Sequence, residues 1–392
     1  MPGLSKTPDI AIVGGGPAGL ALAGILERRG IDYIVYEKGA KDTPPRGGCL
    51  DLHPGSGQRA MKEAGVFEDF KKNSRDSDAT IHLVYDHTGQ KVFSFGEGRD
   101  SPEIDRWAIR KVLLGAIPEH KIVWSKALDS AERDENGRVV LKLADGTTAS
   151  GYKLVVGADG AYSKLRHLVT SAKPKYSGQL YLSGKISPLN PFYATMQSIG
   201  RAGSMIVMGK GNHMFNSRQG DGHYRIDIGF KAPEDFPTSG VVDLSNHDAV
   251  KEFLLQEKYF GAYAPQLQDI IRFSEVPLRP WPLYYMPPDQ LNWKTSPGVT
   301  LIGDAAHVTT PFVGDGVNCS MRDSIILANK LKEFGITEKA VSEYEKEMFP
   351  FAIDMITRSL KSGDMFFEEE NPKTFVEVMQ SDKRLVGTTD YV

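Results

Sequence analysis

Cysteine is scarce in this chain: 392 residues contain two, Cys49 and Cys319. A pair so distant in sequence excludes a disulfide framework and a cysteine-rich zinc site, and it favours a reducing compartment. Long hydrophobic runs are also missing, since no stretch approaches the roughly 18 uninterrupted apolar residues that span a membrane. Because residues 1–9 are too polar for a signal peptide, we expect a cytoplasmic protein with no membrane partner.

An excess of positive charge is absent as well. The chain has 47 Lys and Arg against 50 Asp and Glu, for a formal charge of -3. Such a balance excludes a general basic surface, so we expect no nucleic-acid partner. The length and the 40% hydrophobic content predict a sizeable core and two closely joined domains.

Glycine, by contrast, is concentrated near the amino terminus, in DIAIVGGGPAGLALAGILERRGIDYIVYE (residues 9–37). Residues 9–13 read as a short buried strand, Pro17 can begin a helix, and Gly30 ends it before a second apolar run. This order of strand, glycine turn, helix and strand is the context in which a G-x-G-x-x-G motif predicts dinucleotide binding.

Each element of the motif has a physical task. Gly14 permits the tight turn, Gly16 lets a pyrophosphate approach the backbone, and Gly19 lets the helix pack closely on the strand. Free N–H groups at the helix start would face the phosphates. Glu37 ends the second strand, where an acid can accept a hydrogen bond from a ribose hydroxyl. The motif predicts an ADP moiety and does not separate NAD from FAD.

Two further segments have a strand that ends at an acid. In KLVVGADGAYSKLRHLV (153–169), a buried strand leads to Asp159-Gly160 and then to a basic run that we expect to be helical. In GVTLIGDAAHVTTPFVGDGVNCSMRDSIILANKL (298–331), a strand ends at Gly303-Asp304, and a glycine-containing loop precedes a helix from about Val317. An acid at a strand end can bind sugar hydroxyls, and a helix start can stabilise negative charge.

Together, the first glycine motif with Glu37, the Asp159-Gly160 pair, GDAAH (303–307) and PFVGDGVN (311–318) resemble the group A, aromatic-hydroxylase class of FAD-dependent monooxygenases. RGGCLDLHPGSGQRAMKEAGVFEDF (46–70) and EIDRWAIRKVLL (103–114) look like tetracycline-inactivating monooxygenases and similar fungal enzymes. The resemblance implies an α/β fold: a Rossmann-like FAD-binding domain, an inserted, mostly antiparallel β-sheet substrate domain, and a C-terminal bracing helix. We expect the FAD-binding domain to comprise residues 1–75, 100–175 and 286–330, the substrate domain 76–99 and 176–285, and the C-terminal helical segment 331–392.

The resemblance implies FAD as the cofactor and NADPH or NADH as a transient reductant. The flavin carries the chemistry, so no catalytic side chain is expected. The residues assigned to the cofactor are Gly14, Gly16, Ala18, Gly19, Glu37, Lys38, Arg46, Asp51, Arg110, Asp159, Asp304, Gly314, Gly316, Val317 and Asn318.

For some of these residues and their neighbours the sequence leaves alternatives open. Asp304 is expected to bind either the ribityl or the ribose hydroxyls. Arg106 and Arg110 share one helix, and either could instead belong to a solvated basic edge. Asp315 stands where the family commonly has glutamine, so its carboxylate would either disfavour an anionic flavin or bind another polar group.

The middle segment reads as strands with two chemically different faces. In residues 223–230, Tyr224 and alternate apolar residues share one face, and Arg225 and Asp227 share the other. Ser183, Arg225 and Phe312 are the substrate candidates; Arg225 would bind a phenolate or carboxylate or lie on a wet face, and Phe312 would abut substrate or merely pack.

Three other residues of this part receive structural interpretations. His213 is expected in a turn. Trp281 and Tyr284 could border the cavity, although packing in the core is favoured. Because tetracycline-inactivating relatives carry Gln, Arg and His where this chain has Ser183, Ser204 and Arg225, tetracycline specificity is not supported.

The predicted function is hydroxylation of an aromatic or polycyclic, polyketide-like molecule with O2, through a flavin C4a-hydroperoxide, in secondary metabolism, by a monomer or homodimer. The alternatives are inactivation of a tetracycline-type antibiotic, an FAD-dependent reductase or dehydrogenase without oxygen activation, and a noncatalytic binding protein. A long C-terminal helix, 337–362, with Thr337 as N-cap and a kink at Pro350, is expected to brace the domains.

Overall fold

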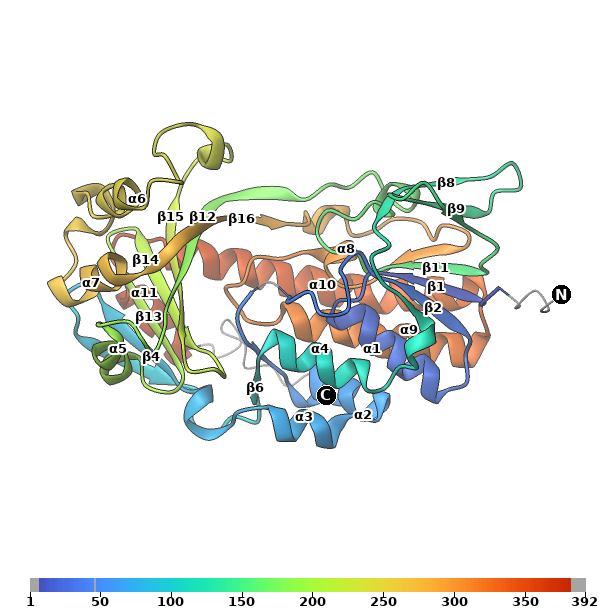
Figure 1. Ribbon diagram of the computed structural model, residues 1–392, viewed down its shortest axis with the longest axis horizontal. Helices are drawn as coiled ribbons and strands as arrows, with labels where there is room; N and C mark the ends of the chain where they lie inside the picture. The colour runs from blue at the N-terminus through green and yellow to red at the C-terminus, as the bar shows by residue number, and fades with distance from the viewer. Residues whose placement is uncertain (1–6, 46, 382–392) are drawn as a thin grey trace.

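The computed structural model describes residues 7–45 and 47–381, and it confirms the α/β class. Two large sheets lie side by side along the long axis of the molecule (Figure 1). The strands are β1 (Ile10–Val13), β2 (Tyr33–Tyr36), β3 (Leu50–Asp51), β4 (His82–Asp86), β5 (Lys91–Phe95), β6 (Glu103–Ile104), β7 (Ile122–Val123), β8 (Leu128–Arg133), β9 (Val139–Leu143), β10 (Thr148–Ala149), β11 (Leu154–Gly157), β12 (Lys175–Ile186), β13 (Ser204–Gly209), β14 (Asn212–Arg218), β15 (Tyr224–Lys231), β16 (Glu275–Tyr285) and β17 (Val299–Leu301). The α-helices are α1 (Pro17–Arg28), α2 (Arg59–Ala64), α3 (Phe67–Asn73), α4 (Arg106–Leu114), α5 (Tyr193–Gly200), α6 (His247–Leu254), α7 (Pro265–Phe273), α8 (Asp304–His307), α9 (Gly316–Phe334), α10 (Glu338–Phe366) and α11 (Lys373–Ser381).

The first sheet is parallel, in the order β17-β11-β1-β2-β7. Its strands are almost continuously apolar because both faces are covered. In a parallel sheet the carboxyl ends of all strands lie at one edge, where α/β proteins bind ligands. The turns after β1, β11 and β17 are the three predicted motifs, so the sheet brings them together at this edge.

Helices α1, α9 and α10 pack on one another beside this sheet, and the small antiparallel sheet β10-β9-β8 covers its other face (Figure 1). The small sheet contributes Ala131, Val139, Leu141 and Leu143 to the same hydrophobic core as the helices. The result is a three-layer unit with the parallel sheet in the middle.

The second large sheet has the order β16-β12-β15-β14-β13-β4-β5 and is antiparallel except between β13 and β4. The predicted alternation in β15 is confirmed. Tyr224, Ile226 and Ile228 are fully buried on the face that packs with α5, α6 and α7, and Arg225 and Asp227 lie on the opposite face. The polar face is directed toward the parallel-sheet unit, so it faces the site described below.

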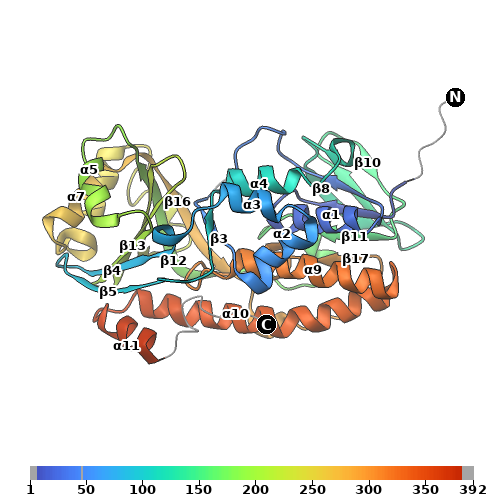
Figure 2. The same cartoon turned by 90° about the horizontal axis from the view of Figure 1, so that it is seen from below.

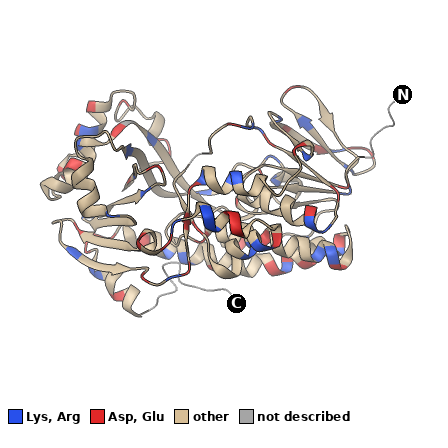
Figure 3. Ribbon diagram, turned by 60° about the horizontal axis from the view of Figure 1, so that its bottom comes forward, with Lys and Arg blue, Asp and Glu red and all other residues tan. Residues whose placement is uncertain are grey.

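Helix α10 runs beneath both sheet units (Figure 2). The Thr337 side chain caps it by accepting a hydrogen bond from Ala340 N, as predicted, and Pro350 lies inside the helix. Lys and Arg are interspersed with Asp and Glu over the helices on the face in Figure 3. Among the described residues, no helix is both long enough and apolar enough to cross a membrane.

Gly65, with φ of 80°, ends α2 and separates it from α3. Two local predictions were wrong. The basic run after Asp159 forms only a short 3-10 turn, Arg166–Leu168, because the Arg166 side chain turns inward to bind backbone carbonyls. His213 lies in the middle of a sheet, on β14, and not in a turn.

Candidate cofactor and substrate site

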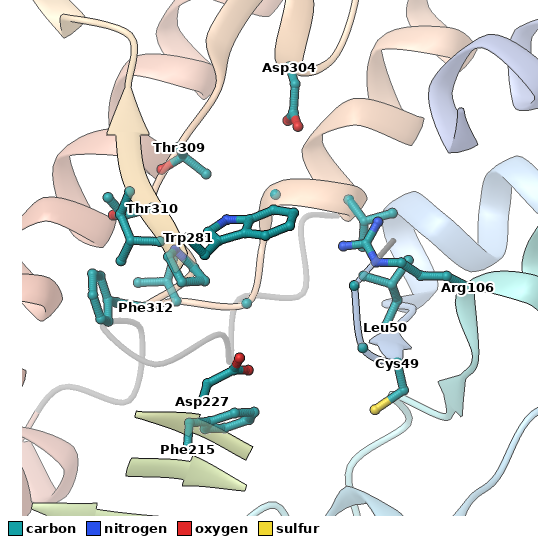
Figure 4. A pocket seen from close by; sticks show the side chains of 18 of the residues that line it. Cys49, Leu50, Arg106, Phe215, Asp227, Trp281, Asp304, Thr309, Thr310 and Phe312 are labelled. Atoms are coloured by element: carbon teal, nitrogen blue, oxygen red, sulfur yellow. The ribbon is translucent and has the colours of Figure 1, made fainter. Parts of the chain in front are cut away.

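A cavity of about 750 Å³ lies between the two large sheets. Asp304 reaches it from the end of the parallel sheet, whereas Asp227 and Phe215 reach it from the second sheet (Figure 4). Of the residues predicted from sequence, those that line it are Gly16, Ala18, Asp51, Arg225, Asp304, Phe312, Gly314, Gly316 and Val317. The cavity therefore joins the three nucleotide motifs to the sheet predicted to hold substrate.

The glycines of the first motif meet different surroundings. Gly14 has φ of +115°, and a Cβ there would lie 2.2 Å from Ala158 O. A Cβ at Gly19 would lie 2.0 Å from Gly14 O, so both residues are glycine because backbone packs against them. Gly16 has no atom within 4 Å of the position of its Cβ, and it caps α1 without a side-chain hydrogen bond. Only Gly16 of these three borders the cavity.

Glu37 fixes the glycine turn. Its Oε2 accepts a hydrogen bond from Gly15 N at 2.6 Å, and its Oε1 accepts one from Gly39 N at 2.8 Å. A carboxylate offers about four lone-pair sites, so acceptor capacity remains for a ribose hydroxyl. Lys38, the next residue, is exposed.

Asp304 projects into the cavity from the start of α8 (Figure 4). The side chain is exposed to the cavity, but the protein around it desolvates the carboxyl and raises its pKa, partly offset by His307, Arg106 and Arg166. The Arg166 guanidinium donates to Ala305 O at 2.8 Å and to Asp304 O at 3.2 Å. These contacts hold the turn that presents the carboxylate.

Behind this turn lies a buried His307–Asp323 pair, with Nε2 and Oδ2 2.6 Å apart. The same Asp323 oxygen accepts a hydrogen bond from Gly303 N at 2.8 Å. Burial opposes protonation of His307, but Cys319 and Asp323 outweigh it and raise the pKa of the imidazole well above its usual value. The pair is therefore an ion pair that anchors the Gly303-Asp304 turn to α9.

Arg106 and Arg110 differ in position although both lie on α4. Arg106 lines the cavity opposite Thr310 (Figure 4), and its Nε is buried with no hydrogen-bond partner among the described residues. Arg110 donates to Thr43 O at 3.0 Å, lies over the Trp124 ring, and does not line the cavity. The arginine that faces the site is thus Arg106, which the sequence left as either a ligand or a surface residue.

The start of α9 also faces the cavity, through Gly314, Gly316 and Val317. Asp315, between the glycines, is turned away and buried: Arg358 Nη2 lies 2.9 Å from its Oδ2, and His53 Nδ1 lies 3.4 Å from its Oδ1. Burial raises the pKa of Asp315, while His53 and Arg358 oppose that rise. Of the two predicted roles for this carboxylate, the structure shows the binding of other polar groups.

Asn318 holds the neighbouring loop. Its Oδ1 accepts from His53 N at 2.9 Å, and its Nδ2 donates to Asp51 O at 2.9 Å. The Asn318 side chain is therefore occupied by protein and does not line the cavity. Asp159 accepts from Lys164 N at 2.8 Å through Oδ2, and its buried Oδ1 has no partner among the described residues. Arg46 lies outside the described residues.

The polar face of the second sheet carries a closed ion pair. Arg225 Nε donates to Asp227 Oδ2 and Arg225 Nη2 to Asp227 Oδ1, each at 2.8 Å. The Ser183 hydroxyl donates to Asp227 and accepts from Arg225 Nη2. Arg225 and Asp227 line the cavity, whereas Ser183 lies behind them.

Aromatic side chains form the remaining wall. Phe312 is 5% exposed and makes an edge contact with Tyr181, their ring centroids 6.2 Å apart. The Tyr181 hydroxyl and His213 Nε2 are 2.9 Å apart, and burial lowers the pKa of His213 to about 3, so this imidazole is neutral. The lining aromatic residues are Phe95, Tyr162, Tyr181, Phe215, Trp281, Tyr284, Phe312 and Phe366.

For Trp281 and Tyr284 the less favoured alternative holds: both border the cavity, and Trp281 is 45% exposed. Other positions were missed from sequence. On β14, His213 and Phe215 share the face directed to the site, and the alternation of NHMFNSR was the available signal. His82 and Arg99 also line the cavity, but an isolated residue in a strand or loop carries no such signal.

A family model described as an FAD binding domain matches residues 7–189 and 292–359. The chain belongs to this family. The monooxygenase asqM of Emericella nidulans is 28% identical to it, over 95% of this chain and 98% of that protein. The FAD-dependent urate hydroxylase of Klebsiella pneumoniae is 24% identical, over 90% of this chain and 89% of that protein.

Solved structures confirm the fold of this FAD-binding chain. Klebsiella pneumoniae HpxO complexed with FAD and uric acid gives a TM-score of 0.76 at 21% identity, over 96% of this chain and 93% of that one. The tetracycline destructase Tet(55) gives 0.73 at 17% identity, over 99% of this chain and all of that one. The predicted class, an FAD-dependent monooxygenase, is thereby confirmed.

The residues present fit FAD. Gly16 leaves open space beside the uncapped start of α1, which suits a pyrophosphate. Arg106 offers an unpartnered buried donor, Asp304 an acceptor for hydroxyls, and the start of α9 a positive dipole end. The positive groups suit the phosphates and the reduced ring of the dinucleotide, and the carboxylate suits its hydroxyls.

Proposed function

We propose that this flavoprotein uses NAD(P)H and O2 to hydroxylate an aromatic or polycyclic small molecule. The observation that supports the proposal is one continuous cavity, lined by Gly16, Arg106 and Asp304 at one end and by an aromatic wall at the other. FAD, when bound, supplies oxygen activation, which no side chain of the protein can supply.

The protein's own residues position and shield the reactants. Gly16, Arg106 and Asp304 would hold the cofactor, and the N–H groups at the start of α9 would stabilise negative charge on its reduced ring. Phe312 and Phe215 present apolar surface that excludes water and orients a flat substrate. Neither a metal nor a protein nucleophile is required by this arrangement.

Thr310 and Phe366 connect this wall to the bracing helix. The Thr310 and Ser359 hydroxyls are 2.8 Å apart, and the Phe366 ring centroid lies 5.3 Å from that of Phe312. Helix α10 would therefore keep the aromatic wall at a fixed place relative to α9.

The proposal is tested with the FAD-loaded protein. A panel of phenolic and polyketide-like compounds is screened for stimulated NADPH and NADH oxidation, with O2 uptake recorded in parallel. The product is then analysed for 18O after reaction under 18O2. We expect a compound that stimulates oxidation and acquires one 18O atom.

Other results would select the remaining alternatives. NADPH oxidation that continues without O2 and yields a reduced product would indicate a reductase. Desaturation of the compound without NADPH, with an added electron acceptor to take up its electrons, would indicate a dehydrogenase. Failure of the purified protein to retain added FAD would favour a noncatalytic protein. Tetracycline is included in the panel, and 18O incorporation into it would establish antibiotic inactivation. We do not expect this result, because the chain has Ser183, Ser204 and Arg225 where the tetracycline-inactivating relatives carry Gln, Arg and His.

A further inference from the structure

The substrate end of the cavity contains one cation and one anion on the same strand, two residues apart. Arg225 and Asp227 both point from β15 into the cavity, and two hydrogen bonds of 2.8 Å join them in a bidentate pair. A bidentate arginine–carboxylate pair is the strongest geometry for such an interaction. The positive charge of Arg225, which the sequence suggested as a partner for an acidic substrate, is therefore already neutralised by Asp227.

Neighbouring contacts keep the pair closed. Ser183 binds both partners from β12, opposite Asp227 in the sheet register. On the other side, a Cβ at Gly48 would lie 2.8 Å from Arg225 Cδ, so the Gly48 backbone packs directly against the arginine stem. Only 9% of the Asp227 side chain is exposed, so surrounding protein packs around the carboxylate where it meets the guanidinium.

The two histidines near this pair are neutral, but other cations lie around the cavity: Arg99 and Arg106 line it, and Arg279 lies opposite Ser183 in the sheet register. Burial lowers the pKa of His82 to about 4, and that of His213 to about 3. Arg99 lies in the loop after β5 and acts on Asp51, whose pKa it helps to lower. Arg106 belongs to the cofactor half, where it lies close enough to Asp304 to oppose the rise in that pKa.

We propose that Asp227 is a specificity-determining residue that masks Arg225 and so selects an uncharged aromatic substrate over an aromatic carboxylate. An incoming carboxylate that approached Arg225 would meet Asp227 directly beside it, and like charges in a site of low dielectric repel strongly. An uncharged ring with a hydroxyl, amide or carbonyl group can hydrogen-bond to the outer edges of the pair without that repulsion. This inference rests on the proposed function, because it assigns this face to the substrate.

The test uses two ligands of nearly equal shape, 1-naphthamide and ionised 1-naphthoate. Each is titrated into the FAD-loaded protein at pH 7.5, and binding is followed by the change in the flavin absorption spectrum. We expect the native protein to bind the amide at least tenfold more tightly than the acid. Asp227→Asn, which keeps the shape and the hydrogen bonds to Ser183, should lower this ratio at least tenfold by unmasking Arg225.

Two matched variants isolate the cause. The double variant Arg225→Gln/Asp227→Asn should lose the gain in naphthoate binding, because the unmasked cation is gone. Asp235→Asn removes one negative charge from an exposed residue near the end of β15 and should leave the ratio as in the native protein. Tighter binding of naphthoate than of the amide by the native protein would overturn the proposal. So would an unchanged ratio in Asp227→Asn, or a gain that survives in the double variant.

The readout needs bound FAD but neither reduction nor oxygen transfer. A protein that shows the expected ratios and yet incorporates no 18O into any substrate would refute the proposed hydroxylation and leave the masking intact. Conversely, hydroxylation with a preference for carboxylates would refute the masking alone. If the native protein binds neither ligand, the Asp227→Asn variant still decides the question. Naphthoate binding by this variant would support the proposal, and no naphthoate binding by it would count against the proposal.

Discussion

The glycine turn after β1 gives the sharpest separation of folding from cofactor binding. Gly14→Ala and Gly16→Ala add the same methyl group two residues apart. At Gly14 the new Cβ would lie 2.2 Å from Ala158 O, on a backbone with φ of +115°. At Gly16 the backbone is extended, with φ of -80°, and no atom lies within 4 Å of the new Cβ.

The costs follow from these surroundings. A side chain at positive φ costs roughly 1–2 kcal/mol, and forcing an extra carbon into packed structure typically costs about 1–3 kcal/mol. Gly14→Ala should therefore lower the free energy of unfolding by about 2–5 kcal/mol. At about 2–4 °C per kcal/mol for a domain of this size, the melting temperature falls by roughly 4–20 °C. Gly16→Ala should change stability by less than about 1 kcal/mol, because reduced freedom of the unfolded chain offsets a poorer helix cap.

The assay compares thermal unfolding of the flavin-free proteins, by circular dichroism, with FAD affinity measured by fluorescence quenching. Gly16→Ala should melt like the native protein and bind FAD at least tenfold more weakly, because its methyl group enters the cavity where a pyrophosphate would lie. Equal loss of melting temperature in both variants would show that Gly16 is a packing residue. Native FAD affinity in Gly16→Ala would refute its assignment to the cofactor.

Three further predictions concern Asp304 and two buried ion pairs, Arg358–Asp315 and His307–Asp323. Asp304→Ala should weaken FAD binding at least tenfold without lowering the melting temperature of the flavin-free protein; unchanged flavin occupancy would refute the role of this carboxylate. Arg358→Met leaves Asp315 buried without its guanidinium partner and should lower the free energy of unfolding by about 3–5 kcal/mol in urea titrations. An unchanged free energy of unfolding would contradict a stabilising role for the pair. The raised pKa of His307 contributes stability that is fully present below about pH 6.5 and is lost as pH rises toward the folded-state pKa. Urea titrations should therefore show the free energy of unfolding falling above that pH, and a His307→Gln variant should lack this component; identical pH profiles would contradict the ion pair with Asp323.

The parts of the fold that could be predicted are those with local causes. Gly19 is required by backbone packing within one strand–helix unit, since its Cβ would meet Gly14 O, and the acids that end β2 and β17 occupy positions set by the parallel topology. The two faces of β15 follow from alternation alone. Such features depend on neighbours in sequence or on a single sheet rule.

What could not be predicted depends on contacts between distant segments. Asp315 meets Arg358, 43 residues away, only because α10 packs along α9. Arg106 and Arg110 share one helix, yet the start of α4 at the end of β6 sends only Arg106 into the cavity. The masking of Arg225 is an intermediate case: Asp227 was visible on the same face, but its distance and the closing role of Ser183 are tertiary facts.

The distribution of charge in the cavity accounts for its division into two halves. In the cofactor half, both Arg106 and Asp304 face the cavity. The buried Arg106 Nε has no partner among the described residues, and burying such a group is costly unless a ligand completes it. In the sheet half, Arg225 and Asp227 satisfy each other, so no ligand charge is needed there. A charged dinucleotide therefore has a reason to occupy one half, and an uncharged aromatic molecule has a reason to occupy the other. The order of the two ligands along the cavity follows from which charges the protein leaves open and which it closes itself.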